Sequence, residues 1–120
     1  MNGTSARQPD YYSDVHNIYN LVEVTPGLPK PFTGPDRAAF HFTSIAHPED
    51  ARVAVLTAIV ILEDAFKVTF APARVTQSGS TRRRVFEALM PGGLTVALVA
   101  MAEHFEDQDT LETAGELVAA

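Results

Sequence analysis

The sequence predicts an α+β fold in which a small sheet of short N-terminal strands packs on a long apolar helix at about residues 49–66, followed by a helical C-terminal half. Two observations carry this prediction. Residues 51–62 (ARVAVLTAIVIL) hold one charge, Arg52, and one other polar side chain, Thr57, so the segment must be buried on most sides. Residues 85–101 are rich in Ala, Leu and Met, which are good helix formers.

The N-terminal part divides into three stretches. Residues 1–14 are polar and show no periodicity, so we expect a flexible leader before a single globular domain at 15–120. The β-branched and aromatic content of residues 15–24 favours a strand, and the alternative is a helix with a stripe of Val15, Ile18, Leu21 and Val22. Residues 25–36 (TPGLPKPFTGPD) contain four prolines and two glycines, which predict an extended Pro-rich arm.

A strand at residues 38–45 and the apolar helix follow. The strand is indicated by AAFHFTSI, in which apolar, aromatic and β-branched side chains dominate. Pro48, Glu49 and Asp50 suit the first turn of a helix, because the proline loses no hydrogen bond there and the acids face the positive end of the helix dipole. The expected buried stripe is Ala51, Val55, Ile59, Leu62 and Phe66.

The C-terminal half has two interpretations. Residues 67–76 alternate partly, which predicts a strand, and Pro72 restricts it to a short or edge strand. Residues 77–81 predict a loop. Residues 82–106 then form either two helices or a β-hairpin that turns at Pro91–Gly93. The helical pair is preferred here, and the hairpin would give a more β-rich sandwich as the alternative fold. A last helix is expected within residues 109–120.

One basic segment is the candidate binding site. Ser80 and Thr81 precede Arg82, Arg83 and Arg84, and these five residues could contact an anion or a nucleic acid through hydroxyl and guanidinium donors. In a helix-turn-helix, Gly79 would form the turn and a recognition helix would begin near Ser80. The competing interpretation is a solvated turn whose arginines pair with acids of the same protein.

No other group of residues specifies a chemistry. The chain has no cysteine, no glycine-rich phosphate motif and no zinc-ligand or calcium-loop spacing, so no catalytic, cofactor-binding or metal residue is predicted. The histidines could not be assigned a role from the sequence; they are His16, His41, His47 and His104. Residues 102–120 hold six acids and neither Lys nor Arg, which is typical of a solvated acidic face.

These observations favour a small non-enzymatic interaction or assembly protein that associates with itself or with another protein. This interpretation rests on an apolar helix that is hard to bury fully in a domain of this size, and on the Pro-rich arm beside it. The alternative is a nucleic-acid-binding regulator that uses Arg82–Arg84, although the net charge of −6 opposes non-specific phosphate binding. The polar N-terminus and the apolar run, shorter than the roughly 20 residues of a membrane span, predict a cytoplasmic protein without membrane contact.

Overall fold

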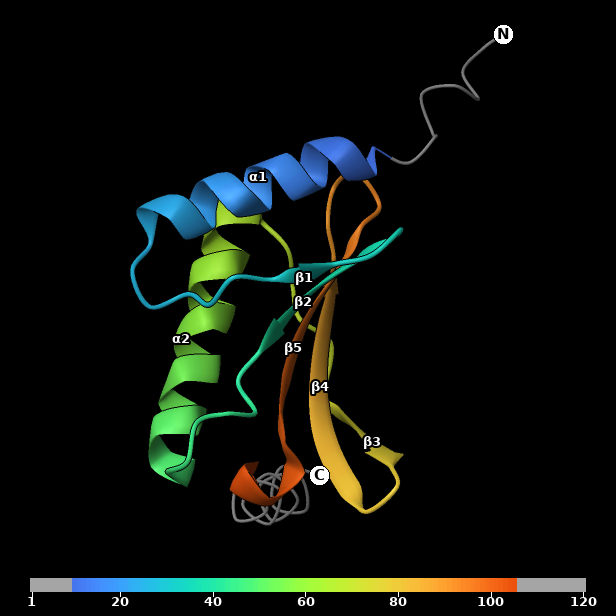
Figure 1. Cartoon of the computed structure of the whole chain (residues 1–120). Helices are drawn as coiled ribbons and strands as arrows, with labels where there is room; N and C mark the ends of the chain where they lie inside the picture. Colours follow the sequence, from blue (N-terminus) through green and yellow to red (C-terminus); the bar gives the residue numbers. More distant parts are fainter. Residues whose placement is uncertain (1–9, 106–120) are drawn as a thin grey trace, which may run out of the picture.

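The computed structural model describes residues 10–105, which form two α-helices, a five-stranded sheet and a short 3-10 helix (Figure 1). Their order is α1 (Tyr11–Val24), β1 (Phe32–Thr33), β2 (Arg37–His41), α2 (Pro48–Phe66), β3 (Arg74–Ser78), β4 (Thr81–Leu89), β5 (Thr95–Met101) and η2 (Ala102–Phe105). The predicted α+β class is therefore confirmed. The predicted helical C-terminal half is wrong, because three of the five strands lie there.

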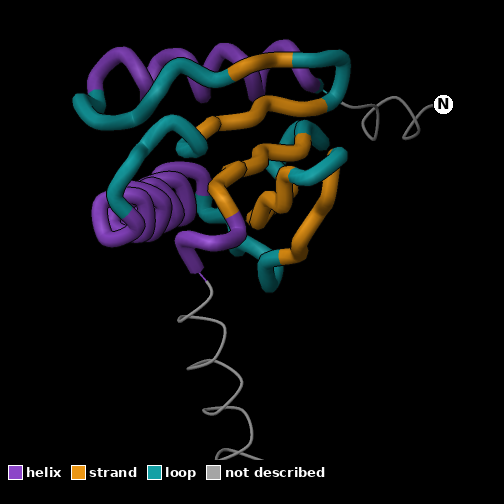
Figure 2. Tube along the Cα trace, turned by 60° about the horizontal axis from the view of Figure 1, so that its bottom comes forward, coloured by secondary structure: helices purple, strands orange, loops and turns teal. Residues whose placement is uncertain are grey.

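The sheet has the strand order β1-β2-β5-β4-β3, with β2 and β5 parallel and the other neighbours antiparallel. Helix α2 lies along one face of this sheet, and α1 crosses the end of the sheet where β4 turns into β5 (Figures 1 and 2). The central strand β5 is buried along most of its length on both faces. This explains its uniformly apolar sequence, which gives no period of two.

The β4–β5 hairpin replaces the expected pair of helices. Its turn is closed by the Met90 amide, which donates to the Leu94 carbonyl, and by the Gly93 amide, which donates to the Met90 carbonyl. Gly93 has a φ of 103°, a conformation that favours glycine. The turn expected in the alternative fold at Pro91–Gly93 is thus present, but it belongs to a single helix-covered sheet and not to a sandwich.

Helix α2 forms where the sequence predicts it, with Pro48 in its first turn and Glu49 and Asp50 beside it. Its buried face consists of Ala51, Val55, Ala58 and Leu62. Ile59, expected within that stripe, is only half-buried. Arg52 joins α2 to η2, because its guanidinium donates a 2.7 Å hydrogen bond to the His104 carbonyl.

Helix α1 contradicts the strand expected at residues 15–24, and it begins inside the segment expected as a leader. The Asp10 side chain caps the helix by accepting a hydrogen bond from the Ser13 amide at 3.1 Å. One turn later the buried Asp14 carboxylate accepts the Gly92 amide at 3.0 Å and the Leu94 amide at 2.9 Å. These bonds attach α1 to the β4–β5 turn, and an added Cβ at Gly92 would lie 2.7 Å from the Asp14 carboxylate.

The remaining expectations are settled only in part. The strand expected at 38–45 is present over Arg37–His41, and the strand expected at 67–76 is the edge strand β3, which begins only at Arg74. The loop expected at 77–81 shortens to a turn at Gly79 and Ser80. The Pro-rich arm includes β1, which pairs with β2. Residues 1–9 of the expected leader and the helix expected within 109–120 lie outside the described residues.

Candidate functional site

The outward side of α2 carries an exposed apolar stripe formed by Val53, Leu56 and Val60. Their exposed fractions are 64%, 47% and 66%. Positions three and seven residues apart lie on one side of an α-helix, so the three side chains form a continuous line away from the sheet. We call this line the α2 stripe. These side chains are the exposed part of the apolar run at residues 51–62.

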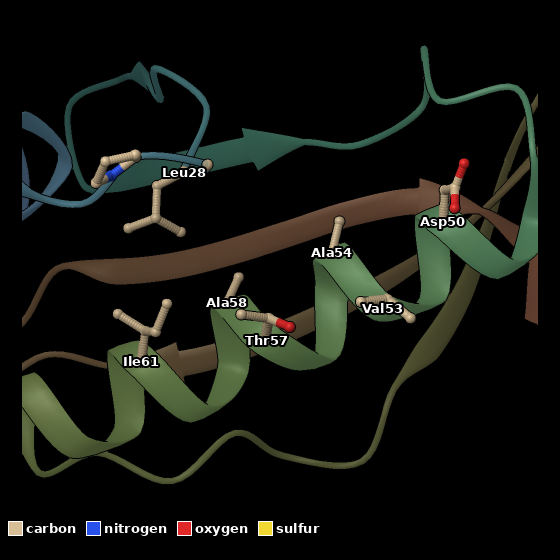
Figure 3. A pocket seen from close by; sticks show the side chains of 9 residues that line it. Leu28, Asp50, Val53, Ala54, Thr57, Ala58 and Ile61 are labelled. Atoms are coloured by element: carbon tan, nitrogen blue, oxygen red, sulfur yellow. The ribbon is translucent and has the colours of Figure 1, made fainter.

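A shallow groove of about 320 Å³ borders the α2 stripe (Figure 3). One wall is the loop at residues 26–28, from which Leu28 points toward α2, and the other wall is α2 itself. Along the helix the groove is lined by Asp50, Val53, Ala54, Thr57, Ala58 and Ile61. Val53 belongs to both the groove and the α2 stripe, so the two form one largely apolar surface with an acid at its N-terminal end.

The second surface is the face of the sheet that points away from α2. The strand register places on it Phe32, Arg37, Ala39, His41, Arg74, Arg83, Val85, Glu87, Leu89, Ala97 and Val99. We call it the open sheet face. Its buried apolar side chains, Val85, Ala97 and Val99, form a small cluster with Ala39, and within residues 10–105 no helix packs there (Figure 2).

An ion-pair bridge crosses the open sheet face. Glu87 on β4 pairs with Arg37 on β2 and with Arg74 on β3, the latter at 3.0 Å. The Arg74 side chain, together with Arg37, holds the pKa of the Glu87 carboxyl below its usual range, although partial burial opposes this. Two guanidinium groups share one carboxylate, so the bridge keeps a net positive charge.

His41 and Phe32 lie at one margin of the open sheet face. Their rings meet edge to face with centroids 5.0 Å apart. Burial, with a smaller contribution from the positive charge of Arg83, lowers the pKa of His41 from its usual value. His41 is therefore neutral at pH 7, and its ring supports Phe32 without adding charge to this face.

The basic segment does not form the single site expected from the sequence. Arg82 and Arg84 point to one face of β4, and Arg83 points to the other, because side chains alternate along a strand. Arg84 is buried with its guanidinium 5.8 Å from the centre of the Phe105 ring. Ser80, Thr81 and Arg82 do share a small hollow of about 220 Å³, but Glu103 also lines it.

The helix-turn-helix interpretation is wrong, because Ser80 lies in a turn and β4 occupies the place of the recognition helix. The sequence pattern also does not reveal which arginines share a surface. Arg37, Arg74 and Arg83 lie on three different strands, and only the strand register brings them to one face. Nucleic-acid binding by Arg82–Arg84 itself stays a prediction.

The other histidines form no common site among residues 10–105. His16 is exposed on α1, His47 precedes α2 without a side-chain capping bond, and His104 is buried in η2. In the same range no three His, Asp or Glu side chains gather as metal ligands, and neither helix is long and apolar enough to cross a membrane.

Comparison of the chain with protein-family models, with curated proteins and with solved structures found no match. The two surfaces described above are therefore the features that bear on function.

The Glu87 bridge predicts a pH dependence of stability. The Glu87 pKa is lower in the folded than in the unfolded chain, so the ionised carboxylate stabilises the folded state. This stabilisation is fully present above the ordinary carboxyl pKa of about 4.3 and is lost as the pH falls through the lower pKa of the folded chain. We expect Glu87→Gln to unfold more easily than the wild type at neutral pH and to lose less stability in acid. Urea unfolding across this pH range measures both effects, with Glu103→Gln, which removes an exposed carboxylate, as the control. Equal acid losses in Glu87→Gln and wild type would contradict this account.

Proposed function

We propose that this chain is a small non-enzymatic assembly protein that self-associates through the α2 stripe and the groove beside it. The single observation that carries the proposal is the exposure of Val53, Leu56 and Val60 on one side of the longest helix. Scattered exposed apolar side chains are ordinary, whereas an aligned row beside an apolar groove is typical of an interaction surface.

The size of the stripe sets the expected strength of association. Full burial of a Val or Leu side chain contributes about 1.5–3 kcal/mol, and these three are already partly buried. Their combined contribution is several kcal/mol, and the surface of the partner copy that they cover adds a comparable amount, so that the total exceeds the lower estimates of the entropy cost of association by a few kcal/mol. We therefore expect weak, concentration-dependent association with a Kd between about 1 µM and 1 mM.

Replacement of both Leu56 and Val60 by glutamate tests the proposal. We call this double substitution the helix-face variant, and we expect it to stay monomeric because it places two charges in the stripe that must become desolvated. Light scattering coupled to size-exclusion chromatography measures the mass, and circular dichroism checks that the variant is folded.

The matched control replaces Tyr12 and Val24 by glutamate. Both side chains are at least as exposed as those of the α2 stripe, but they lie on α1. This variant should associate like the wild type. The proposal fails if the helix-face variant associates as strongly as the wild type, or if the control loses association to the same extent.

A further inference from the structure

The open sheet face carries two large apolar side chains, Phe32 and Leu89, that are left exposed in the described part of the chain. Phe32 and Leu89 are 68% and 67% exposed, and the register places Ala39, Ala97 and Thr95 on the strands between them, with Val85 and Val99 buried in the next row. A sheet is most stable when each apolar face packs against another layer, and here α2 supplies only one such layer.

The open sheet face and the α2 stripe carry opposite charge. On the sheet, Arg37 and Arg74 share Glu87, and the exposed Arg83 adds a further positive charge. On α2 the exposed acids Glu49 and Asp50 lie at one end of the stripe, and Asp64 lies at the other. Lys67 pairs with Asp64 at 3.5 Å, which leaves the outward side of the helix net negative.

Packing of two α2 stripes against each other would be opposed by these charges. In an antiparallel pair centred on the stripe, Glu49 and Asp50 of one copy would approach Asp64 of the other. In a parallel pair each acid would meet its own counterpart. Both arrangements place like charges together at a dehydrated interface, where their repulsion is strongest.

We propose that the α2 stripe of one copy docks on the open sheet face of a second copy. This inference rests on the proposed self-association and names the surface that receives the stripe. The apolar row of α2 would cover Leu89 and Phe32, while the acids at its ends would approach the arginines. Each sheet would then lie between its own α2 and that of the neighbour, as in a three-layer domain.

The dimensions of the two surfaces are compatible. From Glu49 to Asp64 the helix rises by about 22 Å at 1.5 Å per residue. From β2, which carries Arg37, to β3, which carries Arg74, the sheet is about 14 Å wide at 4.7–4.9 Å per strand. An acid at each end of the helix can therefore reach past the margins of the sheet that the arginines occupy.

An interface between two different surfaces has a consequence for the size of the assembly. Each copy keeps one unused stripe and one unused sheet face, so a dimer can add further copies until a ring closes. The mass of the wild type should therefore rise beyond that of a dimer, and added salt should weaken the association because the arginines and acids are exposed.

Mixing two inactive variants tests this arrangement directly. The first is the helix-face variant, which keeps an intact open sheet face. The second is a sheet-face variant with Arg83→Glu and Leu89→Glu, both at exposed positions, which keeps an intact α2 stripe. Each alone should remain at the 13.0 kDa of one chain. An equimolar mixture should form a dimer, because only one functional interface can be assembled from the two.

The outcomes separate this inference from the function on which it rests. If the wild type associates and the helix-face variant does not, but the mixture stays monomeric, the proposed function stands and the docking on the sheet is wrong. The same holds if the sheet-face variant associates like the wild type. If the wild type itself is monomeric at all concentrations, both proposals fail. Binding of a single-stranded oligonucleotide that is lost in the sheet-face variant, without any association of the wild type, would assign the arginines to a nucleic acid instead.

Discussion

Replacement of Asp14 by alanine is expected to lower the free energy of unfolding by about 3–5 kcal/mol. The buried carboxylate accepts two backbone hydrogen bonds, and a bond to a charged group contributes about 1.5–3 kcal/mol. Its removal leaves the Gly92 and Leu94 amides without this acceptor and weakens the attachment of α1 to the β4–β5 turn, to which the Asp10 amide still donates a bond at the Gly92 carbonyl. Urea unfolding followed by circular dichroism measures the loss.

The variant Asp10→Ala is the matched control for this prediction. It removes a carboxylate from the same helix, but one that makes a single exposed capping bond, so a loss of about 1 kcal/mol is expected. Similar losses in the two variants would show that Asp14 does not join α1 to the turn.

The variant Leu62→Asp is expected to prevent folding altogether. Leu62 is fully buried on the face of α2 that packs on the sheet, and an unpaired carboxylate there costs several kcal/mol in addition to the lost packing. This cost is comparable to the whole stability of an ordinary domain, about 5–15 kcal/mol. Circular dichroism and the cooperativity of thermal unfolding report the outcome.

Val60→Asp on the opposite side of the same helix provides the comparison. Val60 is mostly exposed, so this variant should fold and unfold cooperatively with a stability close to that of the wild type. A folded Leu62→Asp variant, or an unfolded Val60→Asp variant, would reverse the assignment of the two faces of α2.

Helix α2 could be predicted because local and long-range signals agree. Pro48 and the two acids after it mark the first turn, and the apolar residues recur with a helical period. The orientation of its buried face could be predicted only in part. Ala58 is the fully buried residue at this point, and Ile59 is only partly buried against the core. A helix that is apolar on nearly every side gives no polar face from which to infer its orientation.

The predictions for the C-terminal half and for α1 were wrong in opposite directions: a strand formed where a helix was predicted, and a helix formed where a strand was predicted. Residues 95–101 include the good helix formers Ala, Leu and Met and show no alternation, yet they form the strand β5, because a central strand buried on both faces has no polar side. Residues 15–24 have strand-like composition, yet the cap at Asp10 and the buried bonds of Asp14 stabilise a helix. In both cases tertiary contacts outweighed propensities of a few tenths of a kcal/mol per residue.

The two proposed surfaces differ in how far they can be predicted from the sequence. The α2 stripe follows from a single helix whose apolar residues exceed what one buried face can hold. The open sheet face depends on Arg37, Arg74 and Arg83 meeting across strands that are not neighbours in sequence, so it requires the register. Arg82–Arg84 was predicted as a binding site because its residues are adjacent in sequence, but a strand places adjacent side chains on opposite faces of the sheet.

Sedimentation equilibrium of the unmodified chain tests the central claim, self-association through α2, most directly. The concentration should extend from about 1 µM to about 1 mM to cover the expected Kd, with the helix-face variant measured alongside. We predict that the average mass of the wild type rises with concentration above 13.0 kDa and beyond that of a dimer, while the variant remains at 13.0 kDa. A wild-type mass of 13.0 kDa throughout this range, or an equal rise in the variant, would contradict the claim.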